Sequence, residues 1–316
     1  MYARKEAVLS SQIEGTQASI NDLLKAEADL FDADTPRDVD EVLNYVGAMN
    51  HGLGRLAELP LSVRLMKEIH ARLLQGVRGR NQQPGEIRRS QNWIGPEGSS
   101  LLNATFIPPP HQDAEGALSD LEKFLHAEND IPALVRIGLI HAQFETIHPF
   151  LDGNGRIGRL LITLFLCQQG LLQKPVLYLS HYFKENRADY YQHLQRVRDG
   201  GDWESWLKFF LRGVGTVAEQ ATDTARKIVA LREDHRATIA GKLGSSGINA
   251  MRLLEHLYQR PTITVNGAKD ILGISYPSAN NLIDSLRRIE VLFEITGQYR
   301  NRLFFYSPYI DLFSNL

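Results

Sequence analysis

Apolar side chains recur every three or four positions along most of this chain, and this period predicts a mainly α-helical fold. The helical segments are expected in these ranges: 1–35 with an interruption at Gly15-Thr16, 39–56, 62–75, from 115 onward, 134–147, 160–168, 182–197 and 203–229. The very apolar segment 160–168 is expected to be the central helix, because a helix without a polar face must be buried on nearly all sides.

One stretch, between Pro84 and Pro110, departs from the helical period. Two short strand-like runs, 92–94 and 104–107, flank the turn-rich residues Gly95-Pro96-Glu97-Gly98. This pattern predicts a hairpin over residues 91–107.

A change of composition divides the chain near its C-terminal quarter. Residues 241–247, Gly-Lys-Leu-Gly-Ser-Ser-Gly, have the composition of a linker. The segments after it are expected in this order: helices over 249–260, 265–272 and 275–289, then strands over 291–295 and 303–306. We therefore expect an N-terminal helical region over 1–110, a core domain over 111–240 and a third domain over 248–316.

Composition and charge exclude several protein classes. The chain has 316 residues, of which 43% are hydrophobic and 23% charged, and these are ordinary globular values. Its formal charge of -2 excludes a protein that mainly coats nucleic acid. The single cysteine, Cys167, permits no internal disulfide and no cysteine cluster for a metal. With no leader-like N-terminus and no membrane span, the expected location is the cytoplasm.

The residues from His148 to Arg159 carry the candidate chemistry: His-Pro-Phe-Leu-Asp-Gly-Asn-Gly-Arg-Ile-Gly-Arg. A glycine-rich turn that leads into a helix exposes backbone N–H groups at the positive end of the helix dipole, and these form an anion site. Arg156 and Arg159 lie three residues apart and can both reach a polyphosphate. Asp152 is a candidate magnesium ligand and His148 a candidate base at neutral pH. The stretch predicts phosphoryl or nucleotidyl transfer.

These residues match every specified position of the Fic signature, His-x-Phe-x-Asp/Glu-Gly-Asn-Gly-Arg-x-x-Arg, so the chain resembles the Fic family. Most Fic proteins transfer AMP from ATP to a Ser, Thr or Tyr hydroxyl of a protein. The resemblance implies that His148 is the general base, that Asp152 binds Mg²⁺ and that Phe150 points into the core. The implied nucleotide-binding residues are Gly153, Asn154 and Gly155 at the α- and β-phosphates, Arg156 at the β-phosphate and Arg159 at the γ-phosphate, with Ile157 and Gly158 in the same segment.

A second match lies upstream, where residues 10–15 are similar to the Fic inhibitory motif Ser/Thr-x-x-x-Glu-Gly/Asn. The same residues also spell a helix capping box. However, helix-forming residues 3–9 already precede them and Gly15 follows, which favours the inhibitory interpretation. The resemblance implies that this motif, from Ser10 to Glu14, folds over the active site, where Glu14 pairs with Arg159 and prevents the ATP γ-phosphate from seating.

The resemblance also implies roles for two further segments. The hairpin resembles the Fic flap, which holds the target by strand addition, with Trp93 and Ile107 as its core-side anchors. Asn186 falls on the nucleoside-binding helix of Fic proteins and would hydrogen-bond the nucleotide. Tyr190 or Tyr191 would line the adenine pocket, and core packing is the alternative for both.

The order of elements after residue 248 resembles a winged helix-turn-helix domain. Its candidate DNA contacts are Ser278, Asn280, Asn281 and Arg287, with Arg300 and Arg302 on the wing. From Ser246 to Leu316 the chain carries seven Lys or Arg and six Asp or Glu, so strong nonspecific DNA binding is not expected. A protein-interaction or dimerisation role therefore stays open beside DNA binding.

The leading hypothesis is a self-inhibited protein adenylyltransferase that uses ATP and Mg²⁺ and acts on a target protein or on itself. Its fold is expected to be a Fic-type helical bundle with a small β-hairpin flap, followed by a winged helix. One alternative is a DNA-binding regulator with a nucleotide-sensing Fic-like scaffold. Another is a related Fic enzyme that removes AMP or transfers a different phosphoryl group. A homodimer is an open expectation by family analogy, and no membrane partner is expected.

Overall fold

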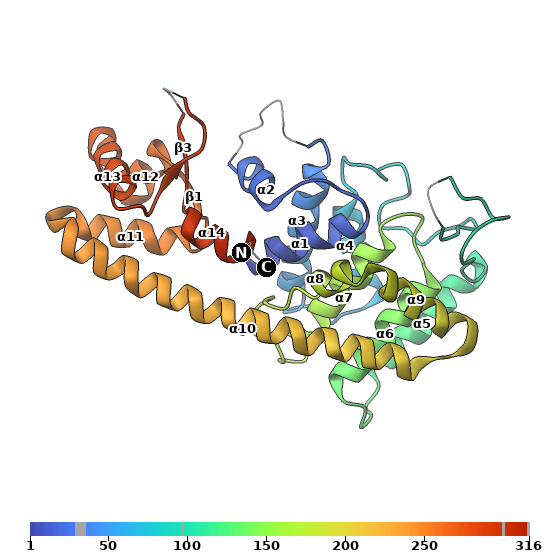
Figure 1. Ribbon diagram of the computed structural model, residues 1–316. Helices are drawn as coiled ribbons and strands as arrows, with labels where there is room; N and C mark the ends of the chain where they lie inside the picture. Colours follow the sequence, from blue (N-terminus) through green and yellow to red (C-terminus); the bar gives the residue numbers. More distant parts are fainter. Residues whose placement is uncertain (29–35, 96–97, 299–300, 315–316) are drawn as a thin grey trace. The chain divides into compact units, whose positions relative to one another are not determined.

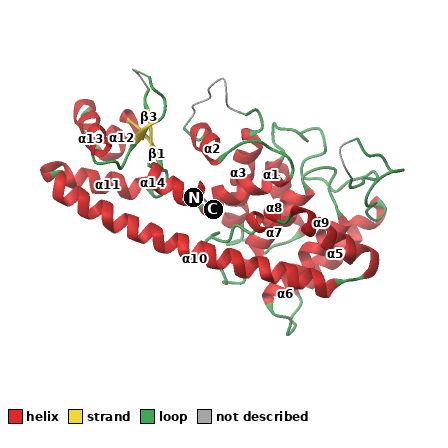
Figure 2. Ribbon diagram, viewed as in Figure 1, coloured by secondary structure: helices red, strands yellow, loops and turns green. Residues whose placement is uncertain are grey.

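The computed structural model describes residues 1–28, 36–95, 98–298 and 301–314. Helices dominate this part of the chain, as predicted, and its strands form a single small sheet (Figure 2). The chain divides into two compact units. The larger unit consists of Tyr2–Ser19 and Pro36–Glu219, and the smaller unit consists of Met1, Ile20–Thr35 and Gln220–Leu316. No helix in the described residues is both long and apolar enough to cross a membrane.

The larger unit is a bundle built around one buried helix. Its helices are α1 (Tyr2–Ile13), α3 (Val39–Arg55), α4 (Val63–Leu73), α5 (His111–His126), α6 (Ala133–Ile147), α7 (Asn154–Gln168), α8 (Ser180–Glu185), α9 (Arg187–Gly200) and the first part of α10 (Trp203–Lys242). Helix α7 packs against α1, α3, α4 and α6 (Figure 1), and almost all of its side chains are buried. It is the expected central helix, and it begins six residues earlier than the apolar pattern indicated.

The predicted hairpin over residues 91–107 is reduced to one antiparallel bridge between Ile94 and Phe106. Both of its backbone hydrogen bonds form, with N···O distances of 2.8 and 3.0 Å. The prediction that Trp93 and Ile107 anchor its core side is wrong, since these side chains are 40% and 49% exposed. The Trp93 indole instead donates to the carbonyl of Ser99. A single bridge does not impose the alternation of a full strand, so the apolar residues are free to face solvent.

The smaller unit combines short helices with the sheet. Its elements are α2 (Ile20–Ala26), the second part of α10, a 3₁₀ turn (Gly244–Ser246), α11 (Gly247–Leu257), β1 (Thr262–Thr264), α12 (Val265–Leu272), α13 (Tyr276–Arg288), β2 (Phe293–Glu294), β3 (Leu303–Phe305) and α14 (Ser307–Ser314). The sheet has the order β1-β3-β2, and both pairs are antiparallel, with Ile263 and Glu294 opposite Phe304. The helices and last two strands follow the predicted order, and the winged-helix assignment stays a prediction.

Several element boundaries differ from the expected ones. The N-terminal helical segment is two helices, α1 and α2, and its expected end near Pro36 falls partly outside the described residues. The segment 182–197 is divided between α8 and α9 at Asn186. Helix α10 runs on to Lys242, because residues 230–240 contain no Gly or Pro to end it. The expected linker is therefore confined to a short turn, and strand β1 and helix α14 were not predicted.

Candidate active site

The predicted base, His148, ends helix α6 in a left-handed backbone conformation. Its φ of 48° and ψ of 60° lie in a region that residues other than glycine seldom adopt. Its N–H donates to the carbonyl of Phe144 at 2.9 Å. Its carbonyl accepts hydrogen bonds from the Arg88 guanidinium at 3.0 Å and from the Asn92 amide at 3.2 Å. These contacts hold the turn that sets the imidazole just before α7.

Buried polar side chains brace the loop between α6 and α7. The Asn154 side chain accepts a hydrogen bond from the N–H of Phe150 at 2.8 Å and donates one to its carbonyl at 2.7 Å. Nδ1 of His70 accepts from the N–H of Gly85 at 2.8 Å, so Nε2 carries the proton and donates to the carbonyl of Asp152 at 2.9 Å. Burial lowers the pKa of His70 to about 4, which keeps this ring neutral. The loop is thus held from both sides.

Phe150 occupies the core position that the sequence indicated. Its side chain is 1% exposed, and its ring stacks on the His70 ring with centroids 3.8 Å apart. This packing fixes the middle of the loop between the base and the first turn of α7.

The first turn of α7 is the predicted anion site, and a carboxylate lies beside it. The first N–H groups of a helix have no partners within it, so they attract an anion together with the helix dipole. Glu14, in the turn after α1, approaches so closely that a Cβ atom at position 155 would collide with its Oε1. Gly155 therefore leaves room for this approach.

Arg159 connects α7 to both ends of the upstream motif. Its Nη2 donates to Glu14 Oε1 at 2.6 Å and to the Ser10 carbonyl at 3.0 Å, and its Nε donates to Ser10 Oγ at 2.8 Å. The arginine is 2% exposed. Burial alone would raise the pKa of Glu14, but Arg159, with smaller contributions from Arg156 and His148, lowers it below its ordinary value. The pair is ionised at neutral pH.

Arg156 has a different acidic partner, which the sequence did not indicate. Its Nη1 donates to Oε2 of Glu41 on α3 at 2.9 Å, and both side chains are buried. Its Nη2 lies 3.7 Å from Asp152 Oδ1. The two arginines of the motif thus pair with carboxylates from different segments. Arg156 pairs with Glu41 on α3, and Arg159 pairs with Glu14 in the turn after α1.

The Asp152 carboxylate is suited to bind a metal ion that arrives together with a nucleotide. It is about a third exposed, and its Oδ1 accepts from the N–H of Gly153 at 2.6 Å. Among the described residues, no group of three or more His, Cys, Asp or Glu could hold a metal ion by itself. Mg²⁺ commonly uses one or two carboxylates together with phosphates and water. This donor set therefore fits Mg²⁺ bound through ATP.

Three of the predicted ligand residues make contacts within the protein, and their nucleotide contacts stay predictions. The Ile157 side chain is fully buried, and its N–H donates to the carbonyl of Gly153. The Asn186 amide donates to the carbonyl of Tyr182 at the junction of α8 and α9. Tyr190 is buried and its hydroxyl bonds the ring of His141, so core packing explains it. Tyr191 is 38% exposed and remains the tyrosine available to a ligand.

The electrostatic surroundings of His148 keep its imidazole neutral. Burial and the nearby Arg198 lower the pKa of His148 to about 3, against the opposing effects of the Glu145 carbonyl and Glu14. An imidazole with this pKa is unprotonated at neutral pH, so one ring nitrogen keeps a free lone pair. Burial raises the pKa of its neighbour Glu145 to about 7.

Several residues that build the site were not found from the sequence: Glu41, His70, Arg88, Asn92 and Glu145. Glu41, His70, Arg88 and Asn92 are distant from the motif along the chain. Glu145 is only three residues before His148, and the one carboxylate of that predicted helix was a signal that could have been used.

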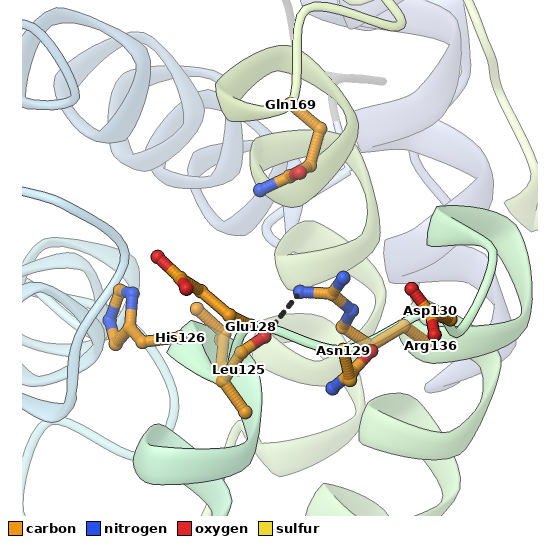
Figure 3. A pocket seen from close by; sticks show the side chains of 8 residues that line it. Leu125, His126, Glu128, Asn129, Asp130, Arg136 and Gln169 are labelled. Carbon is orange, nitrogen blue, oxygen red and sulfur yellow. Dashed lines mark hydrogen bonds between the residues drawn. The ribbon is translucent and has the colours of Figure 1, made fainter.

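A separate pocket, drawn in Figure 3, lies at the other end of α7. It has a volume of about 580 Å³ and is lined by the end of α5, the loop after it, Arg136 and Gln169. Arg136 donates to the carbonyl of Ala127 there. None of the predicted site residues lines this pocket, so it is not part of the candidate site.

Two segments of the chain match described families. Residues 60–166 match the Fic/DOC family, and residues 1–54 match the Fic/DOC family N-terminal. A probable protein adenylyltransferase of Aquifex aeolicus is 29% identical over 203 residues, which cover 62% of this chain and 55% of that protein. The protein adenylyltransferase Fic of Drosophila grimshawi is 28% identical over 187 residues, 58% of this chain and 33% of that protein. The chain thus spans about half or less of these curated relatives.

Solved structures support the fold. A Fic family protein from Desulfovibrio desulfuricans G20 has a TM-score of 0.62 at 19% identity, over 96% of this chain and 86% of that chain. Fic-1 from C. elegans has a TM-score of 0.52 at 23% identity, over 69% of this chain and 61% of that chain. At these identities the likeness establishes the architecture alone.

Proposed function

Because this chain belongs to the Fic/DOC family, we propose that it is a protein adenylyltransferase, which moves AMP from ATP to a Ser, Thr or Tyr hydroxyl of a target protein or of itself. One observation carries the proposal: a neutral histidine, a carboxylate and two arginines gather at the N-terminus of α7. The names of the curated relatives support the same activity.

The residues divide the reaction among them. His148 removes the proton of the acceptor hydroxyl as its oxygen attacks the α-phosphorus, and the bond to the bridging oxygen breaks to release pyrophosphate. The first turn of α7, from Gly153 to Gly155, faces the α- and β-phosphates, while Arg156 and Arg159 take up charge on the β- and γ-phosphates. Such a displacement depends on positioning and charge stabilisation rather than on a protein nucleophile. Asn154 contributes by keeping the loop in shape.

Asp152 is the residue that would hold Mg²⁺ together with the phosphates. Bound Mg²⁺ supplies neutralisation of phosphate charge. The partial exposure of the Asp152 carboxylate supports this assignment, because the ion must arrive with the nucleotide.

We further propose that Glu14 and Ser10 inhibit the enzyme. They bind the Arg159 guanidinium that the γ-phosphate would need. The Glu14 carboxylate also lies beside the first turn of α7, where the phosphates would bind. If the competent state is populated about 1% of the time, loss of Glu14 raises activity by up to about 100-fold.

The test uses ATP labelled at the α- or the γ-phosphate, with Mg²⁺, on the wild type, Glu14→Gly and Glu14→Gly/His148→Ala. We expect label on protein from the α-position alone, stronger in Glu14→Gly and lost with His148→Ala. Transfer of the γ-label would contradict nucleotidyl transfer. A Glu14→Gly protein no faster than the wild type would contradict inhibition by Glu14.

The alternatives have less support. In an enzyme that removes AMP, Glu14 would position water, whereas here its carboxylate is bound to Arg159.

A DNA-binding regulator would need the guanidinium groups of Arg302 and Arg287 to be free to contact phosphates. Arg302 donates to Asn280 at 2.7 Å, and both arginines lie within 4.0 Å of Asp284 and Glu294. Arg300 lies outside the described residues. A dimer and a cytoplasmic location stay predictions.

A further inference from the structure

A buried carboxylate stands beside the proposed base. Glu145 is the only acidic residue of α6 and lies one helical turn before His148. Its side chain is 8% exposed, and Oε2 is 4.0 Å from Nδ1 of the imidazole. A Cβ atom at position 158 would collide with its Oε1, so the glycine at that position of α7 leaves room for the carboxylate.

One atom of each group lacks a partner in this arrangement. Glu145 Oε1 and His148 Nδ1 are buried and have no hydrogen bond within the described part of the chain, although the Glu145 carbonyl lies near enough to raise the pKa of the ring. A buried polar atom without a partner is unfavourable, so a small movement that brings the carboxylate and Nδ1 together is favoured. The separation of 4.0 Å is about 1 Å longer than a hydrogen bond.

We propose that Glu145 is a positioning residue for the base: its carboxylate accepts a hydrogen bond from Nδ1–H of His148 and leaves Nε2 unprotonated toward the acceptor hydroxyl. This inference rests on the proposed adenylyl transfer. The hydroxyl proton then passes to Nε2, the hydroxyl oxygen bonds to the α-phosphorus, and pyrophosphate leaves with the electrons of the broken P–O bond. The carboxylate stabilises the imidazolium that forms.

The protonation state of Glu145 decides which nitrogen is free. An ionised carboxylate can only accept a hydrogen bond, which places the ring proton on Nδ1. A protonated carboxyl would donate to Nδ1 and leave the ring proton on Nε2, where it blocks proton removal. Ionised Glu145 is therefore the active form.

Several charged groups face this pair. Arg159 and Arg198 favour the ionised form of Glu145, while Glu14 opposes it. His148 also faces Arg88 and Arg198, and Tyr190 faces Glu145. The Arg198 guanidinium donates to the Glu145 carbonyl at 3.0 Å and lies 4.3 Å from the centroid of the Phe106 ring. Loss of Glu14 removes the negative charge that disfavours the ionised form of Glu145.

The kinetic test compares Glu14→Gly with Glu14→Gly/Glu145→Gln and with a matched control on the same helix, Glu14→Gly/Gln143→Ala. Gln143 lines a surface pocket with Leu139 and Trp203. We expect Glu145→Gln to lower kcat by about 10- to 100-fold and to change KM for ATP by less than about threefold. Glu14→Gly should lose activity as pH falls below about 7, because Glu145 becomes protonated there. Glu14→Gly/Glu145→Gln should not show this loss of activity at low pH.

A second measurement needs no substitution at Glu145. Ring ¹⁵N shifts of labelled histidine in Glu14→Gly, assigned by the signal lost in His148→Asn, report which nitrogen carries the proton. We expect the Nδ1–H form above pH 7. This readout remains decisive if Glu145→Gln fails to fold.

The outcomes separate the two proposals. A Glu14→Gly protein that transfers no AMP contradicts the proposed function. An active Glu14→Gly protein whose Glu145→Gln derivative keeps both kcat and the pH profile overturns the inference, because the Glu145 carbonyl alone would then orient the ring. An Nε2–H ring in the active protein also overturns it.

Discussion

Arg156 and Arg159 lie on one face of α7, yet their carboxylate partners differ in how easily they can be exchanged. Glu41 is 6% exposed and contacts Arg78 as well as Arg156. Glu14 is 31% exposed and follows the last turn of α1. A buried guanidinium needs an anion beside it, so a phosphate that reaches Arg159 must replace Glu14. At the residue scale, Glu14 is thus the exchangeable partner and Glu41 the permanent one.

The permanent pair predicts a large effect on stability. Glu41→Ala leaves the buried Arg156 charge without its partner and should lower the free energy of unfolding by about 3 kcal/mol. Glu58→Ala is the matched control, because its ion pair with Arg55 is exposed and should contribute little to stability. Denaturant unfolding of both variants, and of Glu41→Ala/Arg156→Ala, measures the effect. Equal losses in Glu41→Ala and Glu58→Ala would contradict a buried, permanent pair.

At the scale of elements, α1 docks through buried polar contacts as well as apolar ones. The Glu6 carboxylate accepts hydrogen bonds from both the N–H and the hydroxyl of Ser180, at the start of α8. Lys5 Nζ lies 4.6 Å from the centroid of the Tyr178 ring. Burial raises the pKa of Glu6 to about 7, although Ser180, Arg159 and Tyr45 oppose this. The contact that places Ser10 and Glu14 therefore contains a group that titrates near neutrality.

This group predicts a pH-dependent stability. The folded pKa of Glu6, about 7, exceeds the ordinary value of 4.5, so the folded state binds the extra proton between these values. Its contribution is thus present at low pH and is lost as pH rises toward 7 and above, by up to about 3 kcal/mol. Relative to Glu6→Gln, the wild type should become less stable from pH 5 to pH 8 in urea unfolding. A stability difference that is constant over this range would be inconsistent with a buried, titrating Glu6.

At the scale of the whole molecule, the chain does not divide where its composition changes. Helix α2 comes between two helices of the larger unit in sequence, but it belongs to the smaller unit. Leu24 of α2 is fully buried in a cluster with Leu303, Phe305 and Ile310. The smaller unit is therefore built from an N-terminal segment and the C-terminal third of the chain.

This shared core predicts that an N-terminal substitution destabilises the C-terminal sheet. Leu24→Ala should lower the free energy of unfolding of the smaller unit by about 2–5 kcal/mol, because it leaves a cavity beside β3. Leu102→Ala is the control, since that side chain is 99% exposed. Hydrogen exchange at Leu303 and Phe305 should become faster in Leu24→Ala alone. Unchanged exchange there would show that α2 does not support the sheet.

The sequence by itself determined the helical class, the position of the central helix and the grouping of residues 148–159. These are local properties: a period of 3.6 residues defines a buried face, and twelve contiguous residues bring a histidine, a carboxylate and two arginines to the start of one helix. The pairing of Glu14 with Arg159 was also predicted, from the resemblance of a short upstream motif, and the structure contains it.

Only the tertiary structure decided which distant side chains complete the site and which apolar residues are buried. Glu41 and His70 reach the loop from other helices, Arg88 and Asn92 reach it from the segment that follows α4, and α2 joins a unit far along the chain. Trp93 and Ile107 have apolar side chains but face solvent, because no element of the described residues covers them beside their single bridge. Local sequence specifies which face of an element is apolar, whereas burial and charge pairing depend on which other elements pack against it.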